Sequence, residues 1–318
     1  MILAERTLFV EAEVAFNRIG KLEKMADSTI MSFTKKPNIL LTWFWAVLGR
    51  SKRVNPEDSM PRISASWKGA TIDESRLLSF NRICEISSDS ISAIFPLSFV
   101  YPVVQRILAS RAAPLSIFQV LNSRIQMTQH RSLEMDKEFD IFSNTKGYRI
   151  RPKGLELDIV SVIKSGDITY LETNHTFYYR GTFGTPDASY VPPRFSPVVD
   201  EDTVQKWFLP GGVGLRFARI LGDWNGLHYS KSYARLLGYK RDFVQPLLVI
   251  ARVVDHFVSL NSKACVKLDV LFKGPLYYNS EVAMKSNSLD NSSLDNGTRF
   301  DVYSAENHRP SISGIIYK

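Results

Sequence analysis

Two long apolar stretches constrain the fold of this chain more than any other feature. Residues 96–110 and 246–260 each begin with Pro-Leu and consist almost entirely of apolar residues. A length of about 15 residues favours a buried helix over a strand. Because a helix that is apolar on nearly all sides must be enclosed, we expect each stretch to form the centre of its own hydrophobic core.

The surroundings of the two stretches indicate an internal repeat. With a shift of 150 residues, Pro96 falls on Pro246, and upstream Phe80-x-Arg-Ile matches Phe217-x-Arg-Ile. Segments of strand character follow each stretch: 117–127, 138–143, 155–163 and 169–179, then 264–272, 281–286, 298–304 and 311–317. We therefore predict two copies of one unit, with their antiparallel sheets joined edge to edge.

Glycine and proline mark the division of the chain. They recur through residues 181–214, where they should interrupt regular structure. We predict an N-terminal extension at 1–57, a first unit at 58–185, a linker at 186–214 and a second unit at 215–318. In the extension, an apolar run within 39–53 has basic flanks. It suits packing on the protein or on a dimer mate better than peripheral contact with a membrane, since an exposed pair of Trp would favour aggregation.

Composition excludes several classes of protein. At 44% hydrophobic and 23% charged residues, the 318-residue chain is typical of soluble globular proteins. Its net charge of +8 is scattered, which suits phosphorylated ligands or an acidic partner better than nucleic acid. Two distant cysteines predict neither a disulfide framework nor a zinc site, and favour a reducing, cytoplasmic location. The longest apolar run is about half of the roughly 20 residues needed to cross a bilayer, so we expect no transmembrane segment.

A polar motif opens the second unit. It reads Gly222-Asp223-x-Asn225-Gly226-x-His228. A carboxylate and an imidazole five positions apart cannot share one helical face, so they need a turn that aims both at one point. Such a pair around one water can add water to an activated double bond or remove it. The alternative is an Asp that caps the next helix and a His that belongs to the core.

This stretch resembles the MaoC-like dehydratases, the (R)-specific enoyl-CoA hydratases of the hotdog superfamily. The matching residues are Phe217-x4-Gly-Asp-x-Asn-x2-His228, then Tyr233-Ala-Arg-x2-Gly-Tyr239 and a Pro-led apolar run. The resemblance implies an α+β double hotdog that hydrates trans-2-enoyl-CoA, or an enoyl carrier protein, reversibly to the (R)-3-hydroxyacyl thioester. It implies acid/base roles for Asp223 and His228, and a turn supported by Gly222, Asn225 and Gly226.

The resemblance also implies what accompanies the chemistry. No metal or redox cofactor is expected, and coenzyme A serves only to carry the substrate. Hotdog units usually associate, so a homodimer is expected, although a duplicated chain can satisfy its own sheet edge as a monomer. The other enzyme reading is a hotdog thioesterase, and the non-enzyme reading is a protein that only binds acyl thioesters or serves as a scaffold.

Three departures from the family bear on activity. Relatives place a backbone N–H donor for the thioester oxygen at the start of the second apolar helix, in or near a His-Gly pair; here Ile250 and Ala251 are the candidates, and Gln245 precedes the helix. Gly226 stands where the family usually has Pro. In the first unit, Ile86 and Ile91 occupy the places of Asp223 and His228, so we expect one active site per chain, with the first unit shaping the acyl pocket.

Other polar residues near the motif have less specific interpretations. Arg216, Arg219, Lys231 and Arg235 are candidates to contact coenzyme A phosphates, with a solvated surface as the alternative. Gln129-His-Arg131 is a candidate ligand contact. The remaining histidines, at 175, 256 and 308, are expected to be structural. The sequence leaves open the acyl chain length, the choice between coenzyme A and carrier protein, the direction of flux and the role of residues 1–57.

Overall fold

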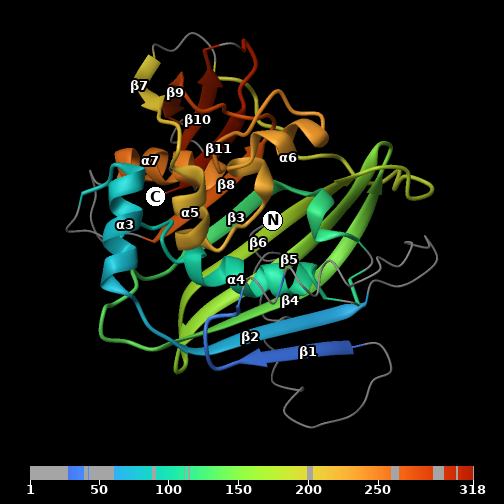
Figure 1. The fold of residues 1–318 in the computed structure, drawn as a ribbon, viewed down its shortest axis with the longest axis vertical. Coiled ribbons are helices and arrows are strands. Elements are labelled where there is room, and N and C mark those ends of the chain that lie inside the picture. The colour runs from blue at the N-terminus through green and yellow to red at the C-terminus, as the bar shows by residue number, and fades with distance from the viewer. Residues whose placement is uncertain are drawn as a thin grey trace.

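The computed structural model describes residues 28–38, 42, 61–87, 91–110, 112–113, 115–198, 203–258, 265–288, 297–305 and 307–317. Figure 1 shows a single curved sheet with the helices gathered on one side of it. Its strands are β1 (Ser28–Phe33), β2 (Arg62–Ala70), β3 (Val120–Gln129), β4 (Phe139–Arg151), β5 (Gly154–Ser165), β6 (Ile168–Arg180), β7 (Thr203–Leu209), β8 (Val266–Phe272), β9 (Ser280–Ser288), β10 (Gly297–Ser304) and β11 (Ile312–Tyr317). The helices are α3 (Glu74–Cys84), α4 (Leu97–Leu108), α5 (Gly214–Leu221), α6 (Lys231–Leu236) and α7 (Pro246–Val258), with 3-10 turns η1 (Ile117–Gln119) and η2 (Gly226–His228).

The strand order confirms the repeat. Across the sheet it is β1-β2-β4-β5-β6-β3-β8-β11-β10-β9-β7. Read inward from either side, β2-β4-β5-β6-β3 and β7-β9-β10-β11-β8 follow the same succession. The two halves meet where β3 and β8 pair antiparallel, for example Ile125 with Val270. This is the predicted edge-to-edge joining of two hotdog units.

The two apolar stretches are the central helices of these units. Every residue of α4 except Arg106 is buried, and α7 is buried without interruption from Leu247 to Val254. Phe80 of α3 and Phe217 of α5, which correspond in the repeat, lie with their ring centroids 5.7 Å apart. The helices of the two units therefore pack on one another as well as on the sheet.

Two strands lie where the sequence suggested none. Residues 203–209 lack Gly and Pro, and as β7 they pair with β9, so the prediction that 181–214 contains no regular element is wrong. In the same way, β1 lies in the predicted extension and pairs in parallel with β2. Apart from Thr42, the apolar run 39–48 lies outside the described residues, as do 289–296 of the predicted loop. The proposed domain boundaries stay predictions.

One strand is longer than predicted. The sequence places a strand at 138–143, but β4 continues to Arg151 through a polar segment. Cross-strand ion pairs hold this extension: Arg149 bonds Asp158 at 2.5 Å, and Arg151 pairs with Glu156 on β5. A search for alternating apolar residues does not detect a strand stabilised in this way.

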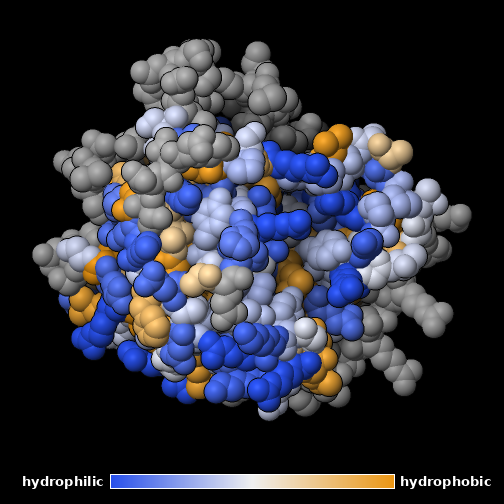
Figure 2. Space-filling view, turned by 90° about the horizontal axis from the view of Figure 1, so that it is seen from above, coloured by the Kyte–Doolittle hydropathy of each residue, from blue (hydrophilic) through white to orange (hydrophobic). Residues whose placement is uncertain are grey.

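One face of the molecule shows how its hydrophobic residues are distributed. Figure 2 shows a face on which hydrophobic residues are scattered among hydrophilic ones rather than gathered in one patch. Among the described residues, no helix has the length and apolar character needed to cross a membrane.

Candidate active site

The turn that carries the motif begins where α5 ends. Gly222 follows the helix in the left-handed region, with φ of +87°. A Cβ at this position would lie 2.8 Å from Cγ of Pro102 on α4. Glycine is therefore required both for the backbone conformation and for the close approach of the turn to the central helix of the first unit.

Asn225 and Gly226 shape the rest of the turn. The Asn225 Oδ1 accepts the Leu227 N–H at 3.2 Å, and its Nδ2 donates to the Val120 carbonyl oxygen at 3.4 Å. A Cβ on Gly226 would lie 2.9 Å from the ring of Tyr233. The Tyr233 ring therefore occupies the space that a side chain would need, which explains glycine where the related family usually has proline.

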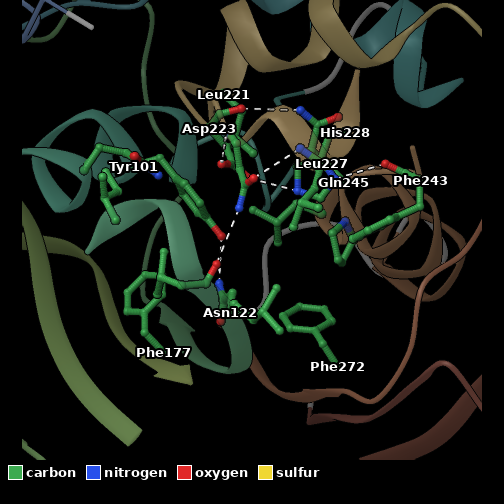
Figure 3. A pocket seen from close by; sticks show the side chains of 17 residues that line it. Tyr101, Asn122, Phe177, Leu221, Asp223, Leu227, His228, Phe243, Gln245 and Phe272 are labelled. Atoms are coloured by element: carbon green, nitrogen blue, oxygen red, sulfur yellow. Dashed lines mark hydrogen bonds and ion pairs between the residues drawn. The ribbon is translucent and has the colours of Figure 1, made fainter. Parts of the chain in front are cut away.

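Asp223 and His228 face one another across a short gap. The His228 Nδ1 lies 3.0 Å from the Phe243 carbonyl oxygen, and because a carbonyl only accepts, Nδ1 carries the hydrogen. In the neutral ring, Nε2 is then an acceptor. It lies 3.6 Å from Asp223 Oδ2, while Asp223 Oδ1 accepts the Asn225 N–H at 3.3 Å (Figure 3).

Burial sets the charge state of the pair. It raises the pKa of Asp223 and lowers the pKa of His228, and the attraction between the two groups opposes both shifts. His228 is therefore a neutral base near pH 7. Its Nε2 is an acceptor, Asp223 in its carboxylate form is another, and the 3.6 Å between them exceeds hydrogen-bonding distance. A water that donates one hydrogen to each group satisfies both.

A cavity opens beside this pair and takes its walls from both units. The second unit contributes Leu221, Asp223, Asn225, Leu227, His228, Phe243, Gln245, Pro246, Leu247 and Phe272. The first unit contributes Tyr101, Gln105, Ile117, Val120, Leu121, Asn122 and Phe177. Most of these side chains are apolar, so the cavity suits a hydrocarbon chain with a few polar atoms at its reacting end.

The structure thus brings most of the predicted site together. Asp223, Asn225 and His228 line the cavity, and Gly222 and Gly226 build the turn that holds them. Ile250 and Ala251 are fully buried and do not line it. They lie beyond the first turn of α7, where backbone N–H groups bond carbonyls within the helix.

The predicted phosphate contacts and the other candidate ligand contact also lie away from the cavity walls. The side chains of Arg216, Arg219, Lys231 and Arg235 are exposed, and none of them lines the cavity. His130, from the candidate segment 129–131, pairs with Glu172 at 3.0 Å and does not line it either.

Sequence reasoning missed the polar residues that the first unit supplies. Tyr101 of α4 and Asn122 of β3 line the cavity, and the Asn122 Nδ2 donates to the Tyr101 hydroxyl oxygen at 2.8 Å. Tyr101 lies within an apolar run and Asn122 at the start of a strand, far from the motif in sequence. The sequence carries no local signal that joins them to Asp223.

Comparison with known proteins places this geometry in context. Neither models of protein families nor curated protein sequences match the chain. Several solved structures, in contrast, match its fold. HtdX of Mycobacterium tuberculosis superposes with a TM-score of 0.66 at 14% identity, over 80% of this chain and 98% of that one.

Two further structures agree with it. A MaoC-like dehydratase from Phytophthora capsici has a TM-score of 0.66 at 13% identity, over 84% of this chain and 97% of its own. The peroxisomal multifunctional enzyme type 2 of Drosophila melanogaster has a TM-score of 0.62 at 15% identity, over 81% of this chain and 48% of that chain. Identities this low show a shared fold, and the chain therefore has the double hotdog fold found in MaoC-like dehydratases.

Proposed function

We propose that the chain belongs to the MaoC-like dehydratases and catalyses the reversible hydration of a trans-2-enoyl thioester to the (R)-3-hydroxyacyl thioester. One observation carries the proposal: the half-buried Asp223 and the buried His228 lie 3.6 Å apart at the wall of a mostly apolar cavity. This is the arrangement that holds and deprotonates a single water.

The reaction then needs only proton transfer. The thioester carbonyl draws electrons from the double bond and leaves C3 open to attack. As the water oxygen bonds to C3, one member of the pair accepts a proton from that water. The proton is passed on to C2, so that the hydroxyl and hydrogen of one water are added across the double bond. Dehydration follows the same steps in reverse, and neither direction requires a metal or a redox cofactor.

The (R) configuration and the carrier of the acyl group rest on the resemblance of the motif to its family. Coenzyme A and an acyl carrier protein present the same thioester to the cavity. A cytoplasmic location is expected from the two distant cysteines, and a homodimer from the tendency of hotdog units to associate. Light scattering of the purified protein measures the oligomeric state.

A specific observation favours a second candidate, a protein that binds acyl thioesters without turning them over. Pro246 begins α7 at the cavity wall and has no N–H to offer the thioester oxygen. A thioesterase is the third candidate, in which the Asp223 carboxylate would direct water to the carbonyl carbon instead of C3.

The test is hydration of crotonyl-CoA and longer trans-2-enoyl-CoAs, followed by the loss of enoyl-thioester absorbance. Wild type is compared with Asp223→Asn and His228→Ala, and each substitution should lower kcat/KM by about 100-fold or more, as removal of an acid/base group does. Asp167→Asn and His308→Ala are matched controls, because both side chains are exposed and lie outside the cavity walls.

The products separate the three candidates. A hydratase yields the 3-hydroxyacyl thioester without free thiol, and chiral chromatography of that product gives its configuration. Release of coenzyme A thiol identifies a thioesterase. If acyl-CoA binds at some chain length but neither product forms at any, the result supports a protein that binds acyl thioesters without turning them over.

A further inference from the structure

The start of α7 supplies few hydrogen-bond donors to the cavity. Pro246 has no N–H. The Gln245 side chain is fully buried, and its Nε2 donates to the carbonyl oxygens of Gly214 at 3.3 Å and Asp223 at 3.5 Å. Its Oε1, an acceptor, has no partner among the described residues. Of the two α7 residues that line the cavity, Pro246 and Leu247, Leu247 has a backbone N–H.

A donor faces the cavity from the opposite unit. Tyr101 extends from α4 into the space between Asp223 and Asn122 (Figure 3). Its side chain is 4% exposed, and its oxygen accepts the hydrogen bond from Asn122. Within the described part of the chain, no acceptor contacts its hydroxyl hydrogen. Burial, and then the charge of Asp223, raises the pKa of Tyr101, so the hydroxyl keeps its proton.

Asn122 is oriented by a buried histidine. The Asn122 Nδ2 lies 3.4 Å from Nδ1 of His175, a fully buried residue of β6. Burial lowers the pKa of His175 to about 3, so its ring is neutral, and in the tautomer that carries the hydrogen on Nε2 the Nδ1 atom accepts from the amide. The amide therefore directs its NH2 group toward both His175 and Tyr101. A hydroxyl that accepts a hydrogen bond becomes a stronger donor through its own hydrogen.

We propose that Tyr101 donates its hydroxyl hydrogen to the thioester carbonyl oxygen of the substrate, and that Asn122 is its positioning residue. The inference deepens the proposed function and rests on it. The hydroxyl proton is not transferred; its hydrogen bond strengthens as negative charge develops on the thioester oxygen during attack at C3. In this chain, a side chain of the first unit performs the role that the backbone N–H groups of Ile250 and Ala251, which bond within α7, cannot perform.

A spectroscopic probe tests this role without turnover. 4-(Dimethylamino)cinnamoyl-CoA is a conjugated thioester whose absorbance moves to longer wavelength when its carbonyl is polarised by hydrogen bonding. Bound to wild type it should show this red shift, and bound to Asp223→Asn it should keep the shift, because Asp223 acts on water. Tyr101→Phe should lose most of the shift and Asn122→Leu part of it. Tyr179→Phe, an equally buried tyrosine outside the cavity walls, is the control.

Kinetics with crotonyl-CoA complete the experiment. Tyr101→Phe should lower kcat by about 100- to 1,000-fold, as loss of an oxyanion donor does, with a small change in KM. Asn122→Leu should lower kcat by a smaller factor and leave KM near wild type. If Tyr101→Phe fails to fold, Asn122→Leu alone decides through the same shift.

The outcomes separate the inference from the proposed function. A wild type that hydrates enoyl-CoA, with Tyr101→Phe keeping both turnover and red shift, overturns the role of Tyr101 and leaves the hydratase intact. A wild type that shifts the probe but hydrates nothing, with Tyr101→Phe losing the shift, overturns the hydratase and supports the role of Tyr101. Failure of wild type to bind the probe overturns both.

Discussion

The two hotdog units share one strand order but contribute different parts of the site. In the first unit a short connection, 85–96, joins α3 to α4, and its Ile86 is buried in the core. In the second unit a longer connection, 222–245, joins α5 to α7 and carries Asp223 and His228 beside the cavity. The same place in the fold thus contributes to the core in one copy and to the proposed chemistry in the other, according to which residues the connection carries.

The central helices differ in the opposite sense. The repeat places Tyr101 of α4 over Ala251 of α7. Tyr101 lines the cavity, whereas Ala251 is buried away from it. We therefore infer a division of labour: the second unit holds the water, and the first unit holds the carbonyl of the proposed substrate. The first unit has no acid/base pair, but it still contributes a group that acts on the proposed substrate.

The largest expected effect comes from making the second unit resemble the first. The double variant Asp223→Ile with His228→Ile replaces both acceptors by the residues that the first unit carries. Its hydratase activity should fall by at least about 100-fold, measured with crotonyl-CoA. The matched variants Ile86→Val and Ile91→Val should keep wild-type activity at a cost of about 0.5–1.5 kcal/mol in stability. Retained activity in the double variant would refute the acid/base assignment.

The next effect is on stability and concerns the contacts of Arg252, which join the second unit to the first. Arg252 of α7 is 8% exposed; its Nε donates to the Cys84 carbonyl oxygen at 3.1 Å, and its Nη2 lies 2.8 Å from Glu85 Oε1. Both partners lie at the end of α3. Arg252→Met leaves the buried Cys84 carbonyl oxygen unpaired and removes the ion pair with the exposed Glu85 side chain, so the free energy of unfolding should fall by about 1–3 kcal/mol.

Urea denaturation measures this loss. Lys137→Met is the control, because Lys137 pairs with Glu134 on the surface, where an ion pair contributes little to stability. Equal effects of the two substitutions would mean that Arg252 does not join the units.

The sequence predicted the features that local pattern and repetition encode. Residues close together in the chain predict the two apolar helices and the strands that follow each of them along the chain. They also predict that Asp223 and His228 lie near one another. The strand β7 was hidden by the Gly and Pro on either side of it. The polar half of β4 was hidden because cross-strand ion pairs, such as Arg149 with Asp158, stabilise it in place of an apolar face.

The sequence could not place the carbonyl donor, because that depends on packing between distant elements. Gln245 bonds the Gly214 and Asp223 carbonyls, and this fixes which residues of α7 reach the cavity. Pro246 and Leu247 reach it, and Ile250 and Ala251 do not. In the same way, the sequence of α4 makes Tyr101 look like an ordinary core residue, because its contact with Asn122, and that of Asn122 with His175, appear only in the structure.

The contact between the turn and α4 is tested as the difference between two glycine variants. Gly222→Ala should lose about 1–2 kcal/mol from the left-handed backbone and about 1–3 kcal/mol more from overlap with the Pro102 ring. Gly238→Ala is the matched control, since Gly238 has φ of +84° and nothing within 4 Å of an added Cβ. Thermal or urea unfolding of both variants isolates the contact as their difference. Equal losses would show that Pro102 yields without cost.

The smallest expected effect is the pH dependence of stability that Asp223 imposes. Its folded pKa is raised above the ordinary value of 3.8 by burial, so the ionised carboxylate destabilises the fold at neutral pH, and this penalty fades as pH falls through the folded pKa. Asp223→Asn removes the charge. Its thermal midpoint should exceed that of wild type at pH 7 to 8, and the difference should shrink on acidification and vanish below pH 3.8. His228, whose folded pKa is lowered, weakens both proteins below its ordinary pKa of 6.5 and does not widen the gap. The contrary result is a wild type that is more stable than Asp223→Asn at pH 8. It would mean that the hydrogen bonds the carboxylate accepts in the turn stabilise the fold by more than its burial destabilises it. The acid/base pair of the second unit would then carry no cost in stability.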